Sequence, residues 1–591
     1  MIKELLHGKA MQDLLCAPGA YRPYPPRSDR EAWEHIPDRD ALTAWGEKAL
    51  AGYPPTTATQ YLEYTRTGSR EVLEAPYFER RRLLIGAVMA ECITDSGRYT
   101  DAVIDGLWHI CEESSWGVSA HNKLYPLPDV TDPMIDLFSA QTAQIIAYTL
   151  YLLRDRLDAV TPLITRRAEL EMKNRIFRPF LNRRDFWWMG EGGRKLNNWT
   201  PWILSNITES MLLLEKDPYL LGRGMDRTVE LLDRYLSFIP PDGGCDEGCA
   251  YWNCAGASLL DCLETLYRAT DGAVSAFDIP LVHEFGLFPV RAHIADDRFW
   301  NFADCNPIVH PDGERLYAYG ERIGSDALKA LGTELSAYCN YSENLRTQMN
   351  RILSRQFHIC PPVSAPTQPD RVFLPELQVF ARRCGRWYAA IKGGNNDESH
   401  NHNDIGSFII YLDNMPLFAD AGNAPYTSKT FGPERYTIWN TRSINHNLPI
   451  INGTEQPAGR QYRAEISEVA ENSICLEIHG AWPEDTAPRT LKREFAVSSD
   501  GVTIRDIMET QSPVPCSWVF ITARKTVNDG KTLRVGSTVM TFPEGASVTA
   551  EPLMPEAEYV LNNYPDGLNR IVLSYPASTK FDMTFSIREK A

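Results

Sequence analysis

The sequence predicts a two-part chain: a helical (α/α) toroid or incomplete barrel over residues 1–360, followed by an antiparallel β-sandwich over residues 370–591. Three observations predict it. Amphipathic helices of similar length follow one another in the first part, with no strand pattern between them. Residues 361–369, PPVSAPTQP, cannot continue a helix and indicate a linker. Beyond them, short apolar runs alternate with turn residues, as strands do.

The helical part shows the period of an amphipathic helix. Ile85, Met89 and Cys92 recur at i, i+4 and i+7, which predicts one apolar stripe on one side of a helix. Many helices joined by short polar turns favour helical hairpins arranged in a toroid. Further helices are expected near residues 200–216, 217–237, 254–270, 277–295 and 323–333.

The second part has the pattern of antiparallel strands. Residues 387–391, 407–412 and 417–419 are short apolar runs, and the pair Asp413-Asn414 between the last two is typical of a turn. In residues 581–587 every second side chain is apolar, as a strand with one buried face requires. These patterns predict a sandwich.

Composition limits the partners and the compartment. The net charge is −17, and nucleic-acid-binding proteins normally show a basic face, so we expect no nucleic-acid partner. An acidic chain favours a short, modestly charged oligosaccharide over a heavily sulfated polymer. The first thirty residues hold no apolar run typical of a signal peptide, and no stretch is apolar enough to span a membrane. We therefore expect a cytoplasmic protein with no membrane partner, and the thirteen cysteines are expected to be free thiols.

Histidines gather in one region of an otherwise histidine-poor chain. His400 and His402 lie in GGNNDESHNHND, and Asp420 and His446 follow. In an extended backbone, side chains two residues apart project from the same face, so His400 and His402 are expected to share one face. A regular hairpin would pair Asp420 with Ser407, so the HNHND segment has to curl back for these groups to meet. Imidazole and carboxylate are ordinary zinc ligands, which predicts a metal site beside a catalytic base.

A second constellation lies in the first part of the chain. The segments WWMGEGG (187–193), NNWTPW (197–202) and DGGCDEG (242–248, with Tyr-Trp following at 251–252) set aromatic rings beside amides and glycine-rich turns. Such groups are typical of sugar clefts, where rings stack on pyranose faces. For Trp188 and Trp202, a place in the helical core is at least as good an interpretation.

These motifs carry a resemblance. NNW, DEGxxYW and SHNHND…FAD…RSINHN, taken together and in this order, resemble the heparinase II/III-like polysaccharide lyases. That family combines an α/α toroid with an antiparallel β-sandwich, and the match covers most of the chain. The family cleaves a glycosidic bond at C4 of a uronic acid by β-elimination and leaves a 4,5-unsaturated sugar. The resemblance implies a uronic-acid-containing oligosaccharide or polysaccharide as substrate, such as a glycosaminoglycan.

The resemblance also implies roles for single residues. Asn198 would hold the uronate carboxylate, although some relatives have a histidine there, which leaves the epimer preference open. Tyr251 would protonate the leaving O4 and, for one C5 epimer, also remove the proton. His400 would be the base for the other epimer. The implied ligands of a structural Zn²⁺ are His402, Asp420 and His446.

Further candidates surround these residues. A tyrosine after the metal aspartate is typical of the family, and both Tyr426 and Tyr436 qualify. For Arg435 an internal ion pair is an equal alternative to a substrate contact, and a lone histidine such as His121 is more often structural. The candidate substrate contacts are Asn197, Trp199, Arg194, Glu247, Trp252, His121, Tyr426, Tyr436 and Arg435.

Two other functions are open from the sequence. A glycoside hydrolase on a helical toroid would use two carboxylates from Asp242, Asp246 and Glu247, but it gives the histidine cluster no role. A non-catalytic carbohydrate-binding protein is the third interpretation, and the presence of both Tyr251 and His400 weighs against it. The sequence also leaves a homo-oligomer open.

Overall fold

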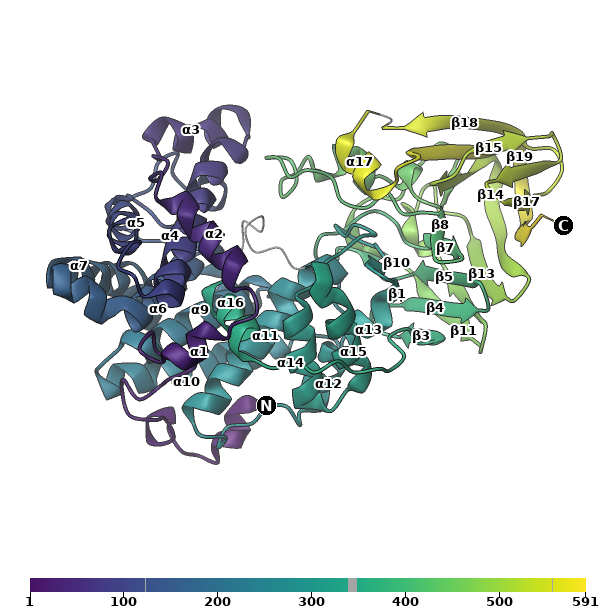
Figure 1. Cartoon of the computed structure of the whole chain (residues 1–591). Helices are drawn as coiled ribbons and strands as arrows, with labels where there is room; N and C mark the ends of the chain where they lie inside the picture. Colours follow the sequence, from purple (N-terminus) through teal and green to yellow (C-terminus); the bar gives the residue numbers. More distant parts are fainter. Residues whose placement is uncertain (123, 339–347, 555, 591) are drawn as a thin grey trace. The chain divides into compact units, whose positions relative to one another are not determined.

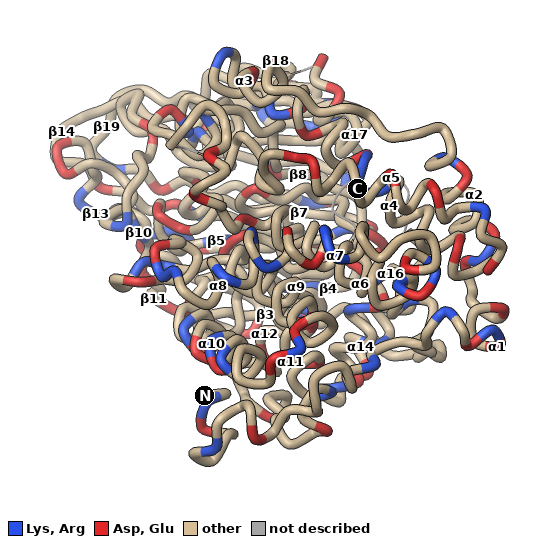
Figure 2. Tube along the Cα trace, turned by 90° about the vertical axis from the view of Figure 1, so that its left-hand side faces the viewer, with Lys and Arg blue, Asp and Glu red and all other residues tan. Residues whose placement is uncertain are grey.

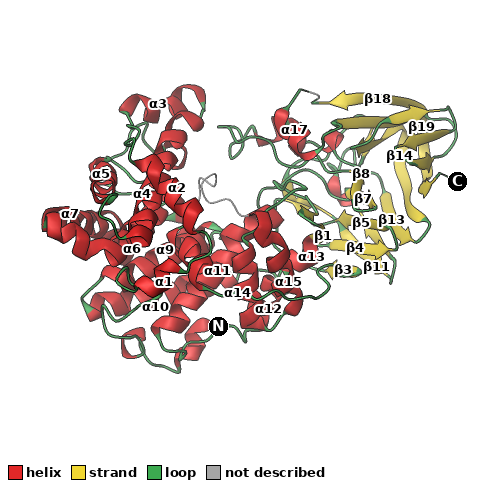
Figure 3. Ribbon diagram, in the orientation of Figure 1, coloured by secondary structure: helices red, strands yellow, loops and turns green. Residues whose placement is uncertain are grey.

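The computed structural model describes residues 1–122, 124–338, 348–554 and 556–590, and it forms two compact units. The helical unit comprises Met1–Ile239, Asn253–His283 and Asp312–Val363. The sandwich unit comprises Pro240–Trp252, Glu284–Pro311 and Ser364–Ala591. All strands of the described residues lie in the sandwich unit (Figure 3). The predicted fold class, helices first and an antiparallel sandwich second, is confirmed.

The units are not continuous along the chain, unlike the expected domains 1–360 and 370–591. Two stretches from the first part, residues 240–252 and 284–311, belong to the sandwich unit. Hydrogen bonds hold them there: the Asp242 carboxylate accepts the backbone N–H groups of Glu376 and Leu377, and Arg383 donates to the carbonyl of Ile294. The chain leaves the helical unit for the last time after Val363, within the proline-rich segment 361–369.

The helices follow the predicted order (Figure 1). They are α1 (Arg30–Glu34), α2 (Arg39–Ala49), α3 (Ala58–Thr67), α4 (Glu71–Thr94), α5 (Thr100–Glu112), α6 (Leu137–Val160), α7 (Pro162–Met172), α8 (Arg178–Asn182), α9 (Trp199–Leu214), α10 (Pro218–Leu236), α11 (Cys249–Ala269), α12 (Pro280–Gly286), α13 (Phe288–Ala292), α14 (Gly313–Ile323), α15 (Asp326–Leu335), α16 (Met349–Phe357) and α17 (Glu558–Asn563).

Two details of the helical prediction are wrong. The stripe of Ile85, Met89 and Cys92 is not one-sided, because α4 is buried nearly all round over its second half, where it packs against α2, α5 and α6. A side chain at Gly46 of α2 would collide with α4, so glycine permits this close approach. The expected helix near 277–295 is two short helices and a strand, since Pro289 opens α13 instead of continuing α12.

The strands are β1 (His293–Ala295), β2 (Arg298–Phe299), β3 (Arg371–Leu374), β4 (Val379–Cys384), β5 (Trp387–Lys392), β6 (Asn395–Asn396), β7 (Phe408–Leu412), β8 (Met415–Phe418), β9 (Pro449–Ile451), β10 (Gly459–Arg463), β11 (Glu465–Val469), β12 (Ser473–Glu477), β13 (Thr490–Ser498), β14 (Gly501–Thr522), β15 (Thr526–Asn528), β16 (Thr532–Val535), β17 (Thr538–Thr541), β18 (Ser547–Leu553) and β19 (Leu568–Glu589). The main path runs β15-β16-β17-β19-β14-β8-β7-β5-β4-β3. The smaller sheets are β1-β2 and β10-β6, and the pairings are antiparallel.

Two long strands, β14 and β19, organise the sandwich. They pair from Gly501↔Arg588 to Thr522↔Asn569, with register shifts in the middle. Toward its end β14 is buried on both faces: Trp518 and Phe520 belong to one hydrophobic cluster, and Val519 and Ile521 belong to another. Alternation therefore fills two layers of core from one strand. The predicted alternation of residues 581–587 and the turn at Asp413-Asn414, where both φ angles are positive, are confirmed.

A buried ion pair lies in the larger core of the sandwich unit. The Arg493 guanidinium donates to both oxygens of Asp506 at 2.8 and 2.6 Å, and the indole N–H of Trp518 donates to the same carboxylate at 2.7 Å. Arg493 also donates to the carbonyls of Gly406 and Asn447. Because every charge is paired and bonded, the group is stable when complete and costly when broken.

Figure 2 shows Lys and Arg interspersed with Asp and Glu. Every cysteine in the described residues is a free thiol, as expected. Within the same residues, none of the helices combines the length and the apolarity needed to cross a bilayer.

We expect Asp506→Asn to lower the free energy of unfolding of the sandwich unit by about 3–5 kcal/mol, because it leaves the buried Arg493 charge without its partner. Native-state hydrogen exchange of the β14 amides measures this unit by itself. The matched control is Asp582→Asn, which breaks an exposed pair with Arg505 and should leave exchange unchanged. Equal exchange in both variants would show that the buried pair does not support the core.

Candidate active site and metal centre

Four side chains from distant parts of the sequence meet in the sandwich unit. Tyr251 lies in the first turn of α11, Asp304 follows β2, His400 precedes β7 and Tyr426 follows β8. The Tyr426 hydroxyl bonds the Tyr251 hydroxyl and lies 3.2 Å from both His400 Nδ1 and Asp304 Oδ2. The rings of Tyr251 and His400 lie 4.1 Å apart, centroid to centroid. Two phenols, an imidazole and a carboxylate therefore form one hydrogen-bonded group.

The curl that the sequence required occurs at His400. Its φ is +57°, a left-handed conformation that is uncommon for residues other than glycine. The N–H of the preceding Ser399 donates to the carboxylate of Asp246 at 3.0 Å, which anchors the turn to the DGGCDEG segment. Local backbone strain is thus held by contacts from elsewhere in the unit, as is common at functional sites.

Asp304 lies at the centre of the group and is almost fully buried. Its carboxylate accepts from His400 Nδ1 at 2.8 Å, from His402 Nε2 at 3.0 Å and from Arg435 at 2.9 Å. Burial alone would raise the pKa of this carboxyl, but the hydrogen bonds from the two histidines and the charge of Arg435 hold it well below its usual range. Asp304 is therefore ionised and orients both histidines.

His400 faces a carboxylate on each side. Its Nε2 lies 3.3 Å from Glu247 Oε2, opposite the contact of Nδ1 with Asp304. Burial opposes a charged ring, yet the hydrogen bonds to Asp304 and Glu247 raise the pKa of His400 to about 9. Burial, together with the neighbouring Tyr251 and Asp304, raises the pKa of Tyr426 well above its usual value.

His402, Asp420 and His446 form the second part of the site. All three are fully buried, and each offers one ligand atom within 4.8 Å of the others. The backbone carbonyl of Asp420 accepts from the Tyr564 hydroxyl at 2.8 Å and from the Asn301 amide at 3.2 Å. The three side chains predicted as metal ligands are therefore brought together by rigid, buried surroundings.

The hydrogen bonds show that this donor set fits a cation. His402 gives Nε2 to Asp304, so its Nδ1 carries the lone pair, and this buried atom has no hydrogen-bond partner among the described residues. His446 Nε2 lies 2.9 Å from the carbonyl of Asn440, which requires an N–H there. In the neutral ring, Nδ1 then presents its lone pair to Asp420 Oδ2, 3.0 Å away. Burial opposes a charged His446 ring, but the charge of Asp420 raises the pKa of His446, so a proton or a metal ion can supply the positive charge that these facing acceptors need.

Three of the predicted substrate contacts, Tyr436, Arg435 and Trp252, bond to neighbouring protein groups in the structure. The rings of Tyr426 and His400 lie near one another, whereas Tyr436 accepts a hydrogen bond from Asn401, so Tyr426 is the tyrosine that belongs to this group. Arg435 is a substrate contact in the prediction, with an internal ion pair as the equal alternative; its buried guanidinium bonds Asp304 and two backbone carbonyls, so the internal ion pair is present. Trp252, also a substrate contact in the prediction, is fully buried, and its indole N–H donates to the carbonyl of Phe285.

Other candidates lie in the helical unit, around the start of α9. The Asn197 side chain accepts from the N–H of Trp199, the first residue of α9, at 3.1 Å. The Trp199 ring lies 4.6 Å from the His121 ring and 4.8 Å from the Trp187 ring, centroid to centroid. Arg194 lies over Trp187 at 4.9 Å. These residues form one aromatic cluster within the helical unit.

The remaining residues of that unit are more buried. His121 bonds the Asp136 carboxylate at 2.7 Å and stacks on Phe138, which agrees with a structural histidine. Asn198 is buried at the N-terminal end of α9. Trp188 and Trp202 are also buried, so both belong to the core of the helical unit.

The three carboxylates of the glycoside hydrolase alternative all have partners within the sandwich unit. Asp242 accepts three backbone N–H groups, from Gly244, Glu376 and Leu377. Asp246 accepts the N–H of Ser399. Glu247 is the member of the set that faces His400. This arrangement lacks the two free carboxylates that a hydrolase needs on opposite sides of a glycosidic bond.

Asp304 is the functional residue that the sequence interpretation missed. Its signal is a repeated tripeptide: Phe-Ala-Asp occurs at residues 302–304 and again at residues 418–420, where it carries the metal aspartate. Both aspartates lie beside His402 in space, one on each nitrogen side. The repeat would have identified a second candidate carboxylate.

Comparisons with known proteins agree with this geometry. Residues 367–558 match the family described as heparinase II/III-like, C-terminal. No curated protein sequence matches the chain. Among solved structures, a heparinase III has a TM-score of 0.62 at 12% identity, over 96% of this chain and 92% of that one.

Two further solved structures share the fold. The heparan sulfate lyase of Pedobacter heparinus has a TM-score of 0.57 at 12% identity, over 95% of this chain and 93% of that one. A chondroitin AC lyase from Streptomyces coelicolor has a TM-score of 0.51 at 12% identity, over 94% and 83%. The family match over residues 367–558 and the fold shared over most of the chain agree with the resemblance seen in the sequence.

Proposed function

We propose that the protein cleaves a uronic-acid-containing glycan by β-elimination. The observation that carries the proposal is the hydrogen-bonded group of Tyr251, Tyr426, His400 and Asp304 in the sandwich unit. It supplies an acid–base phenol whose oxygen is bonded to a second phenol, and both contact a fixed imidazole. Lyases that act on heparan sulfate, chondroitin and xanthan have this fold, which supports the same reaction class here.

The proposed reaction needs one proton acceptor and one proton donor. The C5–H bond of the uronate breaks and its electron pair forms the C4=C5 double bond, while the C4–O4 bond breaks and O4 takes a proton. Tyr251 can do both tasks in turn, taking the C5 proton and delivering it to O4. Its hydroxyl bonds Tyr426, which stabilises negative charge on the oxygen between the two steps.

His400 has a different task in the proposal. A general base needs a free lone pair, and both ring nitrogens of His400 face carboxylates. This favours Tyr251 as the base for the first epimer. For the other C5 epimer, His400 would accept the C5 proton. Its Nε2 then has to leave Glu247 and approach the sugar. From the resemblance, the proposal also assigns the uronate carboxylate to Asn198.

We further propose that His402, Asp420 and His446 hold a structural Zn²⁺. The lone pairs that face one another support this ion, since imidazole nitrogen and carboxylate oxygen are common zinc ligands. When bound, the ion would supply a fixed positive charge that joins the loops carrying its ligands. The residues of this chain do the acid–base work, and the ion holds His402 in place two positions from His400.

The proposed substrate is a short, modestly charged oligosaccharide. The net charge of −17 supports this choice, because a long sulfated polymer would meet strong repulsion. We expect the unsaturated product to form faster from uronic-acid oligomers than from the corresponding polymer, at equal concentration of uronate. A marked preference for the polymer would contradict this substrate class.

The first experiment is a panel of heparan, chondroitin, hyaluronan, alginate and xanthan oligosaccharides, followed by the ultraviolet absorbance of the new C4=C5 double bond. We expect Tyr251→Phe to lower the rate by about 10²–10⁴-fold, because it removes the proton donor without changing the ring. The matched control is Tyr436→Phe, whose hydroxyl contacts Asn401 outside the group, and it should retain most activity. Cleavage without the absorbance would show hydrolysis and refute the proposal.

For Asn198→Ala we expect a large loss of rate with a smaller change in KM, because the amide would stabilise the carboxylate chiefly when charge develops at C5. Steady-state kinetics on the best substrate of the panel measures the split. Asn197→Ala, which removes the hydrogen bond to the N–H of Trp199, is the control for local structure. Equal effects of both substitutions would assign Asn198 a structural role.

Removing a metal ligand tests the zinc proposal without an activity assay. We expect His446→Ala to lower the zinc content by one ion per chain in elemental analysis, because a three-residue donor set loses one member. His479→Ala changes a half-exposed histidine and should leave the zinc content unchanged. Circular dichroism shows that each variant is folded. An unchanged zinc content in folded His446→Ala would rule out this site.

A further inference from the structure

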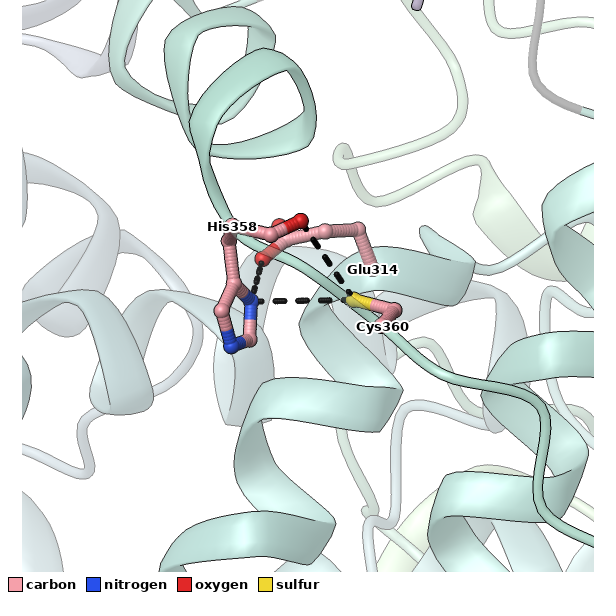
Figure 4. A group of neighbouring side chains, drawn as sticks. All are labelled: Glu314, His358 and Cys360. Carbon is pink, nitrogen blue, oxygen red and sulfur yellow. Dashed lines mark hydrogen bonds and ion pairs between the residues drawn. The ribbon is translucent and has the colours of Figure 1, made fainter.

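A second group of metal-binding side chains lies in the helical unit, apart from the candidate active site. Glu314 comes from α14, and His358 and Cys360 follow the end of α16 (Figure 4). Each offers a ligand atom within 4.8 Å of the other two. Among the described residues, only this group and the set of His402, Asp420 and His446 bring three such atoms together.

The two nitrogens of His358 have different surroundings. Nδ1 lies 2.8 Å from Glu314 Oε1 and 3.7 Å from Cys360 Sγ, so it faces an oxygen and a sulfur (Figure 4). Nε2 lies 2.7 Å from Glu321 Oε2. Metal-ligating histidines usually give the second nitrogen to a carboxylate in this way, which fixes the ring and strengthens the ligand nitrogen.

The backbone places Cys360 beside His358. His358 is extended, with φ −95° and ψ 120°, and Cys360 is two residues further, so their side chains share one side of the strand-like segment. Pro361 follows and restricts the chain at once. Glu314 is buried; Arg315 donates to both of its carboxylate oxygens, and Ser354 donates to Oε1. A carboxylate has about four acceptor positions, so these three bonds orient Glu314 and leave one position, which His358 Nδ1 faces.

We propose that Glu314, His358 and Cys360 bind one Zn²⁺, with water in the fourth position. Thiolate, imidazole and carboxylate are the three ligand types that zinc takes from proteins, and the sulfur selects against magnesium and calcium. The ion takes the place of the proton shared by Glu314 and His358. It ties α14 to the segment after α16, next to the point where the chain leaves the helical unit.

Cobalt tests the proposal, because Co²⁺ takes zinc sites and a thiolate ligand gives a charge-transfer absorption in the near ultraviolet. The site of His402, Asp420 and His446 has no sulfur and gives none. We expect wild-type protein titrated with Co²⁺ to show this band and Cys360→Ser to lose it. Cys384→Ser, which changes another half-buried cysteine in the sandwich unit, should keep it. Absence of the band in wild type, or its presence in Cys360→Ser, overturns the proposal.

Alkylation of the unmodified protein gives an independent measurement. We expect saturating Zn²⁺ to slow the reaction of Cys360 with iodoacetamide by about tenfold or more, because a metal-bound thiolate is a poorer nucleophile. Peptide mass spectrometry follows Cys360, Cys384 and Cys16 in one sample, and the last two should react at rates independent of zinc. Equal rates for Cys360 with and without zinc would contradict the proposed site.

Discussion

The candidate site depends on one buried carboxylate. Asp304 contacts His400 with one oxygen and His402 with the other, and Arg435 balances its charge. The bond to His402 Nε2 determines which nitrogen of that ring has a lone pair, and so directs Nδ1 toward Asp420 and His446. The bond to His400 orients the ring that lies against Tyr251. One aspartate therefore joins the hydrogen-bonded group around Tyr251 and His400 to His402 of the proposed metal-ligand set.

The sandwich unit uses the same physical device at a second place. Arg493 and Asp506 are buried and bonded to each other at two points, and Asp304 and Arg435 are buried and bonded at one; both pairs have further hydrogen-bond partners. Arg493 also holds the carbonyls of Gly406 and Asn447, which lie just after the segment of His402 and just after His446. Buried charges of this kind add little net stability, but they tolerate few alternative arrangements. They make the positions of the ligand loops specific.

Much of the fold and part of the site could be predicted from the sequence because those signals are local. Helix and strand periods identified both units, and the clustering of histidines identified His402 and His446. Long-range contacts gave no such signal. Asp304 lies 96 residues before His400, and nothing around it marks it except the repeated Phe-Ala-Asp.

The differences between expectation and structure also have physical causes. Trp252 and Arg435 lie in motifs that the sequence interpretation linked to function, and both are buried by their neighbours, which a short motif does not reveal. The prediction of a one-sided apolar stripe on α4 was wrong because other helices enclose α4, so that this helix has no face exposed to solvent over its second half. The geometry of the hairpin required the segment around His400 to curl back. Its left-handed backbone at His400 could not be located from the sequence, because no glycine marks that position.

The division of the chain has an evolutionary consequence. The sandwich unit is assembled from three stretches, so Tyr251 and Asp304 are encoded upstream of the linker that precedes the heparinase II/III-like C-terminal match. A recombination event at that linker would transfer His400, His402, Asp420 and His446 but leave Tyr251 and Asp304, their hydrogen-bonding neighbours, behind. The segment matched by the family model therefore lacks part of the hydrogen-bonded group of the sandwich unit.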